Sequence, residues 1–137
     1  MVTLPSGLPD VLADDEDIAR FLTQSSQFNT TMVKPAAFLP NPKDRETSVS
    51  RHGREPAERL WQIGITAAGE RTLHGAALFK AHVVRNAGLE LAADEPPELH
   101  AAIRGWPWLD NDPELQKGQQ KVRAILIASA AGAPMLR

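Results

Sequence analysis

Three side chains suited to anion recognition cluster in one short stretch of the sequence, at Arg51, His52 and Arg54. Arginine carries a planar, permanently charged group that donates hydrogen bonds to carboxylates and phosphates. Histidine changes its charge near neutral pH. The cluster therefore predicts an anion-recognising turn. The alternative is that the two arginines form exposed ion pairs with neighbouring acidic side chains, and such pairs contribute little to stability.

A strand and a helix are expected to hold this turn. Thr47 and Val49 alternate with serines, which is the pattern of a half-buried strand. Pro56 suits the first turn of a helix, whose apolar side chains continue to Ile63 before Gly64 ends it. The start of a helix presents free N–H groups and the positive end of the helix dipole. This position therefore favours a bound anion.

Tryptophans and one further histidine extend the candidate surface. Trp106 and Trp108 flank a proline, and we expect either that Trp106 fills the core or that the pair forms a docking surface. Trp61, on the inward face of the helix after the turn, is expected in the core. His100 is expected beside the Arg51 turn. The predicted ligand- or partner-binding set is Arg51, His52, Arg54, His100, Trp106 and Trp108.

Several kinds of chemistry find no support in the sequence. Cysteine is absent, which excludes a thiol nucleophile, a disulfide framework and a thiolate metal site. His74 and His82 are too far apart for the paired histidines of a zinc helix, so we expect no metal. Serine-hydrolase, phosphate-loop and dinucleotide-binding glycine motifs are also missing. No catalytic residue and no cofactor are predicted.

Composition sets the class of protein. The 137 residues carry a net charge of −2 with a pI near 6.1, so no general attraction to nucleic acid or anionic membranes is expected. The N-terminus lacks the features of a signal peptide, and no window reaches the length of a membrane span. We expect a cytoplasmic protein with an N-terminal arm over 1–11, one domain over 12–132 and a C-terminal tail over 133–137.

The pattern of apolar side chains predicts the other elements. We expect a helix that opens at Asp14–Asp17 and carries Ile18, Phe21 and Leu22 on its buried stripe. Further expected elements are strands over 32–39, 47–51, 89–93 and 98–105, a helix over 72–87 and a last helix that begins at Pro113. Together these predict a compact single α+β domain of antiparallel β-hairpins with four helices packed on them.

Four segments resemble a pattern found in a group of small bacterial proteins. They are VKPAAF (33–38), SVSR (48–51), LWQIG (60–64) and HAAIRGWP (100–107). The resemblance covers most of residues 14 to 130. It implies that the Arg51 turn and the His100–Pro107 segment belong together, and it supplies no catalytic residue.

Two shorter segments, Leu73–Gly75 and Ala87–Leu89, resemble ADP-ribosyl- and phosphotransferase-like folds. Members of those folds bind NAD-like ligands with an arginine or histidine on a strand, so the resemblance implies a nucleotide or phosphate ligand.

Two functions follow from these observations. The first is a non-catalytic accessory or interaction module that binds an acidic protein surface or another anionic partner. The alternative is an enzyme that acts on a nucleotide or a phosphorylated ligand. The enzyme would require Arg51, His52, Arg54 and His100 to converge in one pocket, because a catalytic base must lie within hydrogen-bond reach of its target.

Overall fold

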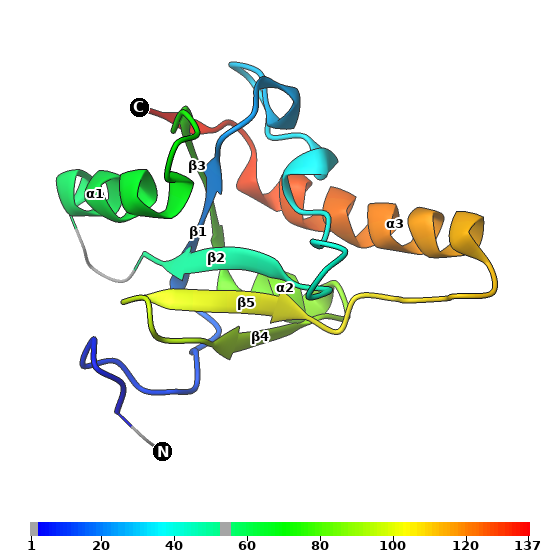
Figure 1. Ribbon diagram of the computed structural model, residues 1–137, viewed down its shortest axis with the longest axis horizontal. Coiled ribbons are helices and arrows are strands. Elements are labelled where there is room, and N and C mark those ends of the chain that lie inside the picture. The colour runs from blue at the N-terminus through cyan, green and yellow to red at the C-terminus, as the bar shows by residue number, and fades with distance from the viewer. Residues whose placement is uncertain (1–2, 53–55) are drawn as a thin grey trace.

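The computed structural model describes residues 3–52 and 56–137, and it places six strands of this part of the chain in one antiparallel sheet (Figure 1). The order across the sheet is β4-β5-β2-β1-β3-β6. The strands are β1 (Asp17–Leu22), β2 (Thr47–Arg51), β3 (Gly75–Lys80), β4 (Glu90–Ala93), β5 (His100–Arg104) and β6 (Met135–Leu136). The helices are α1 (Ala57–Ala68), α2 (Ala81–Asn86) and α3 (Pro113–Ala131). The α+β class is confirmed, but the described residues form three α-helices and not four.

Helices cover both faces of the sheet. Figure 1 shows α1 and α3 on opposite sides of it. Along β1, Ile18 and Leu22 pack into the core that contains Ile127 of α3, whereas Ala19 and Phe21 pack into a second, smaller core with α1. The two faces follow from the alternation of side chains along a strand. A central strand of this sheet is therefore buried on both sides.

The expected helix at 14–22 was wrong, because residues 17–22 form β1. The spacing of Ile18 and Leu22 fits a helix as well as a strand, and the acidic run before them resembles a helix start. Ala19 and Ile18 are both fully buried on opposite faces, so β1 shows no alternation of apolar and polar side chains. Such strands cannot be distinguished from buried helices by periodicity alone.

The single helix predicted over 72–87 was also wrong, since this segment contains β3 followed by the short helix α2. Strand β3 begins at Gly75, where it approaches β6 closely. A Cβ on Gly75 would lie 2.4 Å from the carbonyl oxygen of Met135 in β6. The predicted end is confirmed. Gly88 has a φ of +80°, and the amide of Leu89 donates to the carbonyl of Val84 at 3.2 Å.

The segment 32–39 does not form the predicted strand, and it does not pair with β2 in the described sheet. It contains a single 3₁₀ turn at Pro35–Ala37 instead, because proline fixes φ and removes one backbone donor. A further short 3₁₀ turn lies at Ser25–Gln27. Phe38 and Val49 nevertheless share the larger core. The hydroxyl of Thr47 donates to the carbonyl of Phe38 at 2.6 Å and fixes the segment against β2.

The remaining elements agree well with the sequence pattern. β2, β4, β5 and α3 occupy the predicted positions, and the carboxylate of Asp112 accepts from the amide of Leu115 at the start of α3. Within the predicted arm, Ser6 donates through its amide and hydroxyl to the carboxylate of Glu95. The predicted tail contains β6, which pairs with β3. Trp61 is half-buried beside the α1 core and is not fully enclosed as expected.

Helix α1 runs through Gly64, which was expected to end it, and stops before Gly69 at a φ of +62°. Gly64 serves a different purpose. A Cβ at this position would lie 2.7 Å from the ring of Phe21 and 2.8 Å from Leu73. The absence of a side chain therefore allows α1 to approach the sheet closely.

We predict opposite effects for the same substitution at two helical glycines. Gly64→Ala should lower the free energy of unfolding by about 1–3 kcal/mol, because the added methyl group overpacks the contact with β1. Gly118→Ala in α3 should raise it by about 0.5–1 kcal/mol, because an alanine Cβ there meets no atom within 4 Å and alanine favours the helix. Urea unfolding of both variants tests this. Stabilisation by Gly64→Ala would show that α1 does not lie so close to the sheet.

Candidate functional site

Arg20 occupies the place where two central strands separate. The paired positions of β1 and β2 are Ile18 with Arg51 and Ala19 with Ser50, and the ladder ends there. The guanidinium of Arg20 fills the opening that follows. Its Nε donates to the carbonyl of Ala37 and its Nη1 to the carbonyl of Ser48, each at 2.8 Å. Arg20 is thus anchored by neutral backbone groups.

The charge of Arg20 has no counter-ion among the described residues, since no carboxylate oxygen of theirs lies within 4.0 Å of its guanidinium. Burial, and after it the charge of Arg71, lower the pKa of Arg20 from the usual value of an arginine to about 10. Arg20 therefore remains a cation at neutral pH. The lowered pKa means that the folded environment disfavours this charge relative to water.

Arg71 brings a second guanidinium to the same place from the end of α1. Its Nε donates to the carbonyl of Ala68 at 3.1 Å and its Nη2 to that of Ala67 at 3.2 Å. A longer contact of 3.5 Å joins Nη1 to the hydroxyl of Thr23. These bonds satisfy carbonyl groups at the C-terminus of the helix. In the described part of the chain, Arg71 likewise has no carboxylate partner within 4.0 Å.

The two arginines line a cavity of about 260 Å³ beside β1, β2 and the end of α1. Its polar lining consists of Arg20, Thr23, Ser48, Ser50, Arg71 and His100, and its apolar lining of Phe21, Val49, Ala67, Ala68 and Pro97. The cavity therefore combines two cations, three hydroxyl groups and an imidazole with an apolar wall. We call it the arginine cavity.

His100 reaches the arginine cavity because it lies opposite Ser50 in the pairing of β5 with β2. Residues that pair across neighbouring strands face the same side of the sheet. The ring Nδ1 of His100 lies 3.1 Å from the carbonyl oxygen of Asp94 and 3.3 Å from its carboxylate. These contacts fix the orientation of the ring.

Arg51, the first residue of the predicted set, serves the fold. Its guanidinium is fully buried, with Nε 2.8 Å and Nη2 2.6 Å from the two carboxylate oxygens of Glu16, and its Nη1 donates to the carbonyl of Pro9 at 2.6 Å. All of these contacts are internal. Arg51 follows Ser50 in the strand, so its side chain points to the opposite face from His100. The backbones of the two predicted segments are adjacent, but these two side chains are not brought together.

The other predicted residues are dispersed. Arg54 lies outside the described residues, and His52 donates through its amide to the carbonyl of Asp17 at 2.9 Å. Trp106 is 6% exposed and belongs to the larger core, which confirms the first of its two expected roles. Trp108 is half-buried. The guanidinium carbon of Arg45 lies over the Trp108 ring, 4.7 Å from the ring centre. Of the predicted set, His100 lines the arginine cavity.

Arg20 and Arg71 were missed by the sequence analysis. One signal was available: Arg20 interrupts an otherwise apolar run, IARFL, and a charge within such a run requires a partner or a function. Arg71 follows a turn and resembles an ordinary surface residue. Fifty-one positions separate the two arginines in the numbering, and only the packing of α1 on β1 brings them together.

Other site classes find no support in the described residues. Residues 3–52 and 56–137 contain no group of three or more histidine, aspartate or glutamate side chains that could hold a metal ion. None of the helices described is both long and apolar enough to cross a bilayer. Comparison with protein-family models, curated proteins and solved structures finds no match to the chain. The site must therefore be interpreted from its own geometry.

We predict that the Arg51–Glu16 pair is essential for stability. Glu16→Gln should lower the free energy of unfolding by about 3–5 kcal/mol, because it leaves the buried guanidinium without a counter-charge. The control is Asp17→Asn, which breaks the exposed pair with Lys80 and should change stability by at most about 1 kcal/mol. Guanidinium unfolding measures both. Equal effects of the two variants would contradict the assignment of Arg51 as a structural cation.

Proposed function

We propose that the protein is a non-catalytic module that binds an anionic partner, and that the arginine cavity receives the anionic group. The observation that supports this proposal is the presence of two guanidinium groups without carboxylate partners among the described residues at one cavity. Arg71 is exposed, but Arg20 is half-buried, and a charge that is removed from water is usually paired. A site that places Arg20 beside Arg71 is therefore suited to a negative charge that comes from outside the chain.

The energetics of Arg20 support the same proposal. Burial and the neighbouring Arg71 both oppose its positive charge, which is why its pKa falls to about 10. An anion bound between the two guanidinium groups would offset both effects and raise this pKa again. Binding should therefore stabilise the folded protein.

The neutral groups of the cavity suit a carboxylate or a phosphate. Ser48 and Ser50 place hydroxyl groups beside the two arginines, and a hydroxyl can donate to an anionic oxygen. His100 adds a ring that becomes a second kind of cation when it is protonated. An anionic group in this cavity could receive hydrogen bonds from several directions, and charge-assisted bonds of this type are stronger than neutral ones.

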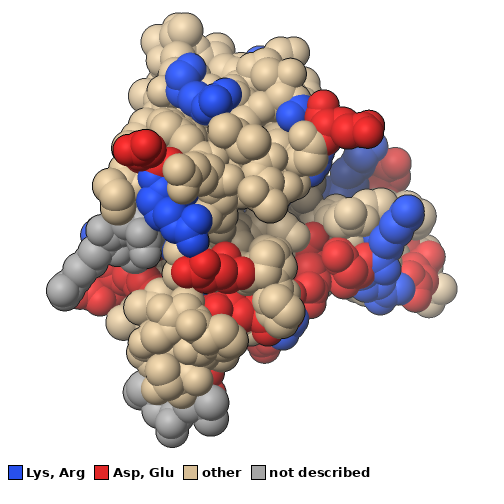
Figure 2. Space-filling view, turned by 60° about the vertical axis from the view of Figure 1, so that its left-hand side comes forward, with Lys and Arg blue, Asp and Glu red and all other residues tan. Residues whose placement is uncertain are grey.

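The surface around the site favours recognition of one anionic group over contact with a broad acidic surface. Figure 2 shows basic and acidic side chains interspersed on the face that it presents, without one continuous basic patch. The net charge of −2 also provides no general attraction to acidic partners. Specific binding must therefore come from the cavity.

An enzyme would also bind an anionic ligand in this cavity, but it would in addition need a reacting side chain such as a nucleophile with its base. Ser50 and His100 are paired across two strands, yet no hydrogen bond joins their side chains in the described structure. A nucleophile and its base usually lie within hydrogen-bond reach. This is why a binding function is favoured.

We expect phosphate to raise the melting temperature of the wild-type protein, in comparison with chloride at equal ionic strength, because ligands of the native state stabilise it. Arg71→Gln should remove most of this increase, since it deletes one of the two cations. Lys121→Gln deletes the same charge from the exposed surface of α3 and should retain the increase. Each variant is compared with its own melting temperature without phosphate, which separates binding from stability.

Two results would refute the proposal. One is an equal effect of phosphate and chloride on the wild-type protein at every concentration tested. The other is an unchanged phosphate effect in Arg71→Gln, which would place the anion elsewhere.

A further inference from the structure

A second cavity, of about 410 Å³, adjoins the arginine cavity. Arg20, Ser48 and Arg71 line both. The two arginines thus lie at the junction of two spaces. An anion bound between them would have room for a substituent on either side.

The linings of the two cavities differ in character. The arginine cavity has an apolar part to which Phe21, Val49 and Pro97 contribute. The second cavity is mostly polar, and its further lining includes Gln24, Gln27, Asn41, Glu46 and Thr47. One side of the junction therefore suits an apolar group, and the other suits a group that forms hydrogen bonds.

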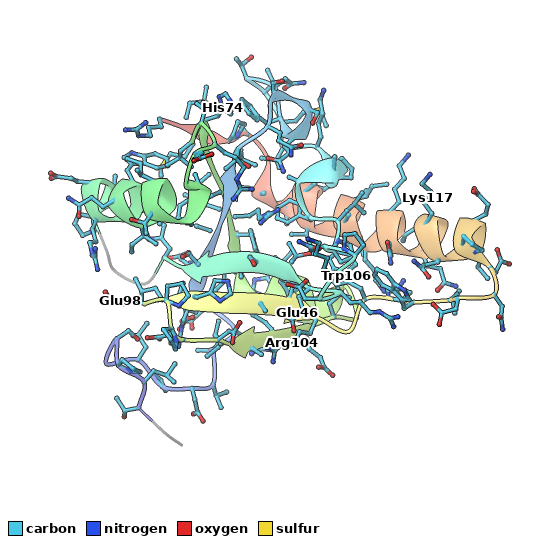
Figure 3. The ribbon with its side chains drawn as sticks, in the orientation of Figure 1. Glu46, His74, Glu98, Arg104, Trp106 and Lys117 are labelled. Atoms are coloured by element: carbon cyan, nitrogen blue, oxygen red, sulfur yellow. The ribbon has the colours of Figure 1, made fainter. Side chains whose placement is uncertain are left out.

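Glu46 restricts what the second cavity can accept. Its carboxylate forms an ion pair with Arg104, and Figure 3 shows both residues on the same part of the sheet, away from Glu98. The carboxylate would repel a second negative charge in this space, and it can accept hydrogen bonds from hydroxyl groups. A neutral, hydroxylated group fits these conditions.

We propose that the ligand is a small phosphodiester with one apolar arm and one neutral, hydroxylated arm. This inference rests on the proposed anion-binding function and specifies its ligand. A carboxylate or a phosphate monoester carries one substituent, so it could extend from the junction into only one of the two cavities. A phosphodiester carries a substituent on each side of a single negative charge. Its two non-bridging oxygens can each face one of the two guanidinium groups.

Nucleic acid also contains phosphodiesters, but the described structure favours a small molecule. Nucleic-acid binding draws most of its affinity from many phosphate contacts along a basic surface. The chain has a net charge of −2, and the face in Figure 2 mixes both signs of charge. A single junction between two cavities fits one phosphodiester unit.

Isothermal titration calorimetry with four probes at pH 7 tests this inference. The probes are phenyl phosphate, glycerol 3-phosphate, their diester phenyl glycerol phosphate, and an eight-residue oligothymidylate. We expect the diester to bind at least about tenfold more tightly than either monoester. Phosphate monoesters carry more negative charge than the diester at this pH, because their second pKa is about 6. Tighter binding of the diester must therefore come from its second arm.

Two exposed alanines provide matched variants, because Ala36 lines only the second cavity and Ala67 only the arginine cavity. Ala36→Leu should remove the advantage of the diester and leave the affinity for phenyl phosphate unchanged. Ala67→Leu should weaken the binding of phenyl phosphate at least about fivefold and leave the affinity for glycerol 3-phosphate unchanged. Melting curves of both variants confirm that each is folded.

The outcomes separate this inference from the proposed function. If the monoesters bind and the diester binds no more tightly than they do, the proposed anion binding is retained and the phosphodiester inference is refuted. If none of the four probes binds, both are refuted. Tighter binding of the oligothymidylate than of the diester would overturn the assignment to a small molecule. Reduced affinity for every probe in both variants would contradict the separate roles of the two cavities.

Discussion

The arrangement of the site depends on the separation of β1 from β2 around the guanidinium of Arg20. The two strands pair at their Ile18 and Ala19 positions and then diverge, so the carbonyl of Ser48 is available to the side chain of Arg20. The carbonyl of Ala37 completes the anchor. A cation held by neutral backbone groups keeps its charge uncompensated. The arginine cavity lies beside this guanidinium, and a ligand could enter there.

Two arginines on neighbouring strands, Arg51 fully buried and Arg20 half-buried, have contrasting environments. Arg51 is enclosed with the carboxylate of Glu16 and connects β2 to the N-terminal segment. Among the described residues, Arg20 is anchored by carbonyl groups and lies near a second cation, Arg71. The residue type is identical, and the partners determine the role: Arg51 contributes to folding, and Arg20 is suited to binding.

Much of the fold was predictable where local chemistry decides the structure. The alternation in β2, the proline at the start of α3 and the glycine after α2 each act over a few residues, and all three were predicted at the correct place. β1 and β3 were not. Both are buried on two faces by elements distant in sequence, and their apolar runs fit either a helix or a strand. Recognising them required the tertiary structure.

The site was less predictable for a related reason. Arg51 is the last residue of the correctly predicted strand β2 and His52 follows it, but one position along a strand reverses the face to which a side chain points. His100 was placed next to the right segment, where it pairs with Ser50. Arg20 and Arg71 meet only because α1 packs closely on β1 at Gly64. No local sequence pattern indicates that α1 packs on β1 in this way. The spacing of residues in the sequence therefore could not show that Arg20 and Arg71 line one cavity.

The central claim is that an anion is bound between Arg20 and Arg71, and the Nε–Hε resonances of the arginine side chains report on it most directly. These resonances can be followed by NMR during a titration with phosphate at constant ionic strength. We expect saturable shifts for Arg20 and Arg71 with a common dissociation constant, while Arg51, enclosed by Glu16, stays unchanged. Shifts confined to arginines other than Arg20 and Arg71, or a non-saturable drift of all arginine signals, would contradict binding at this site.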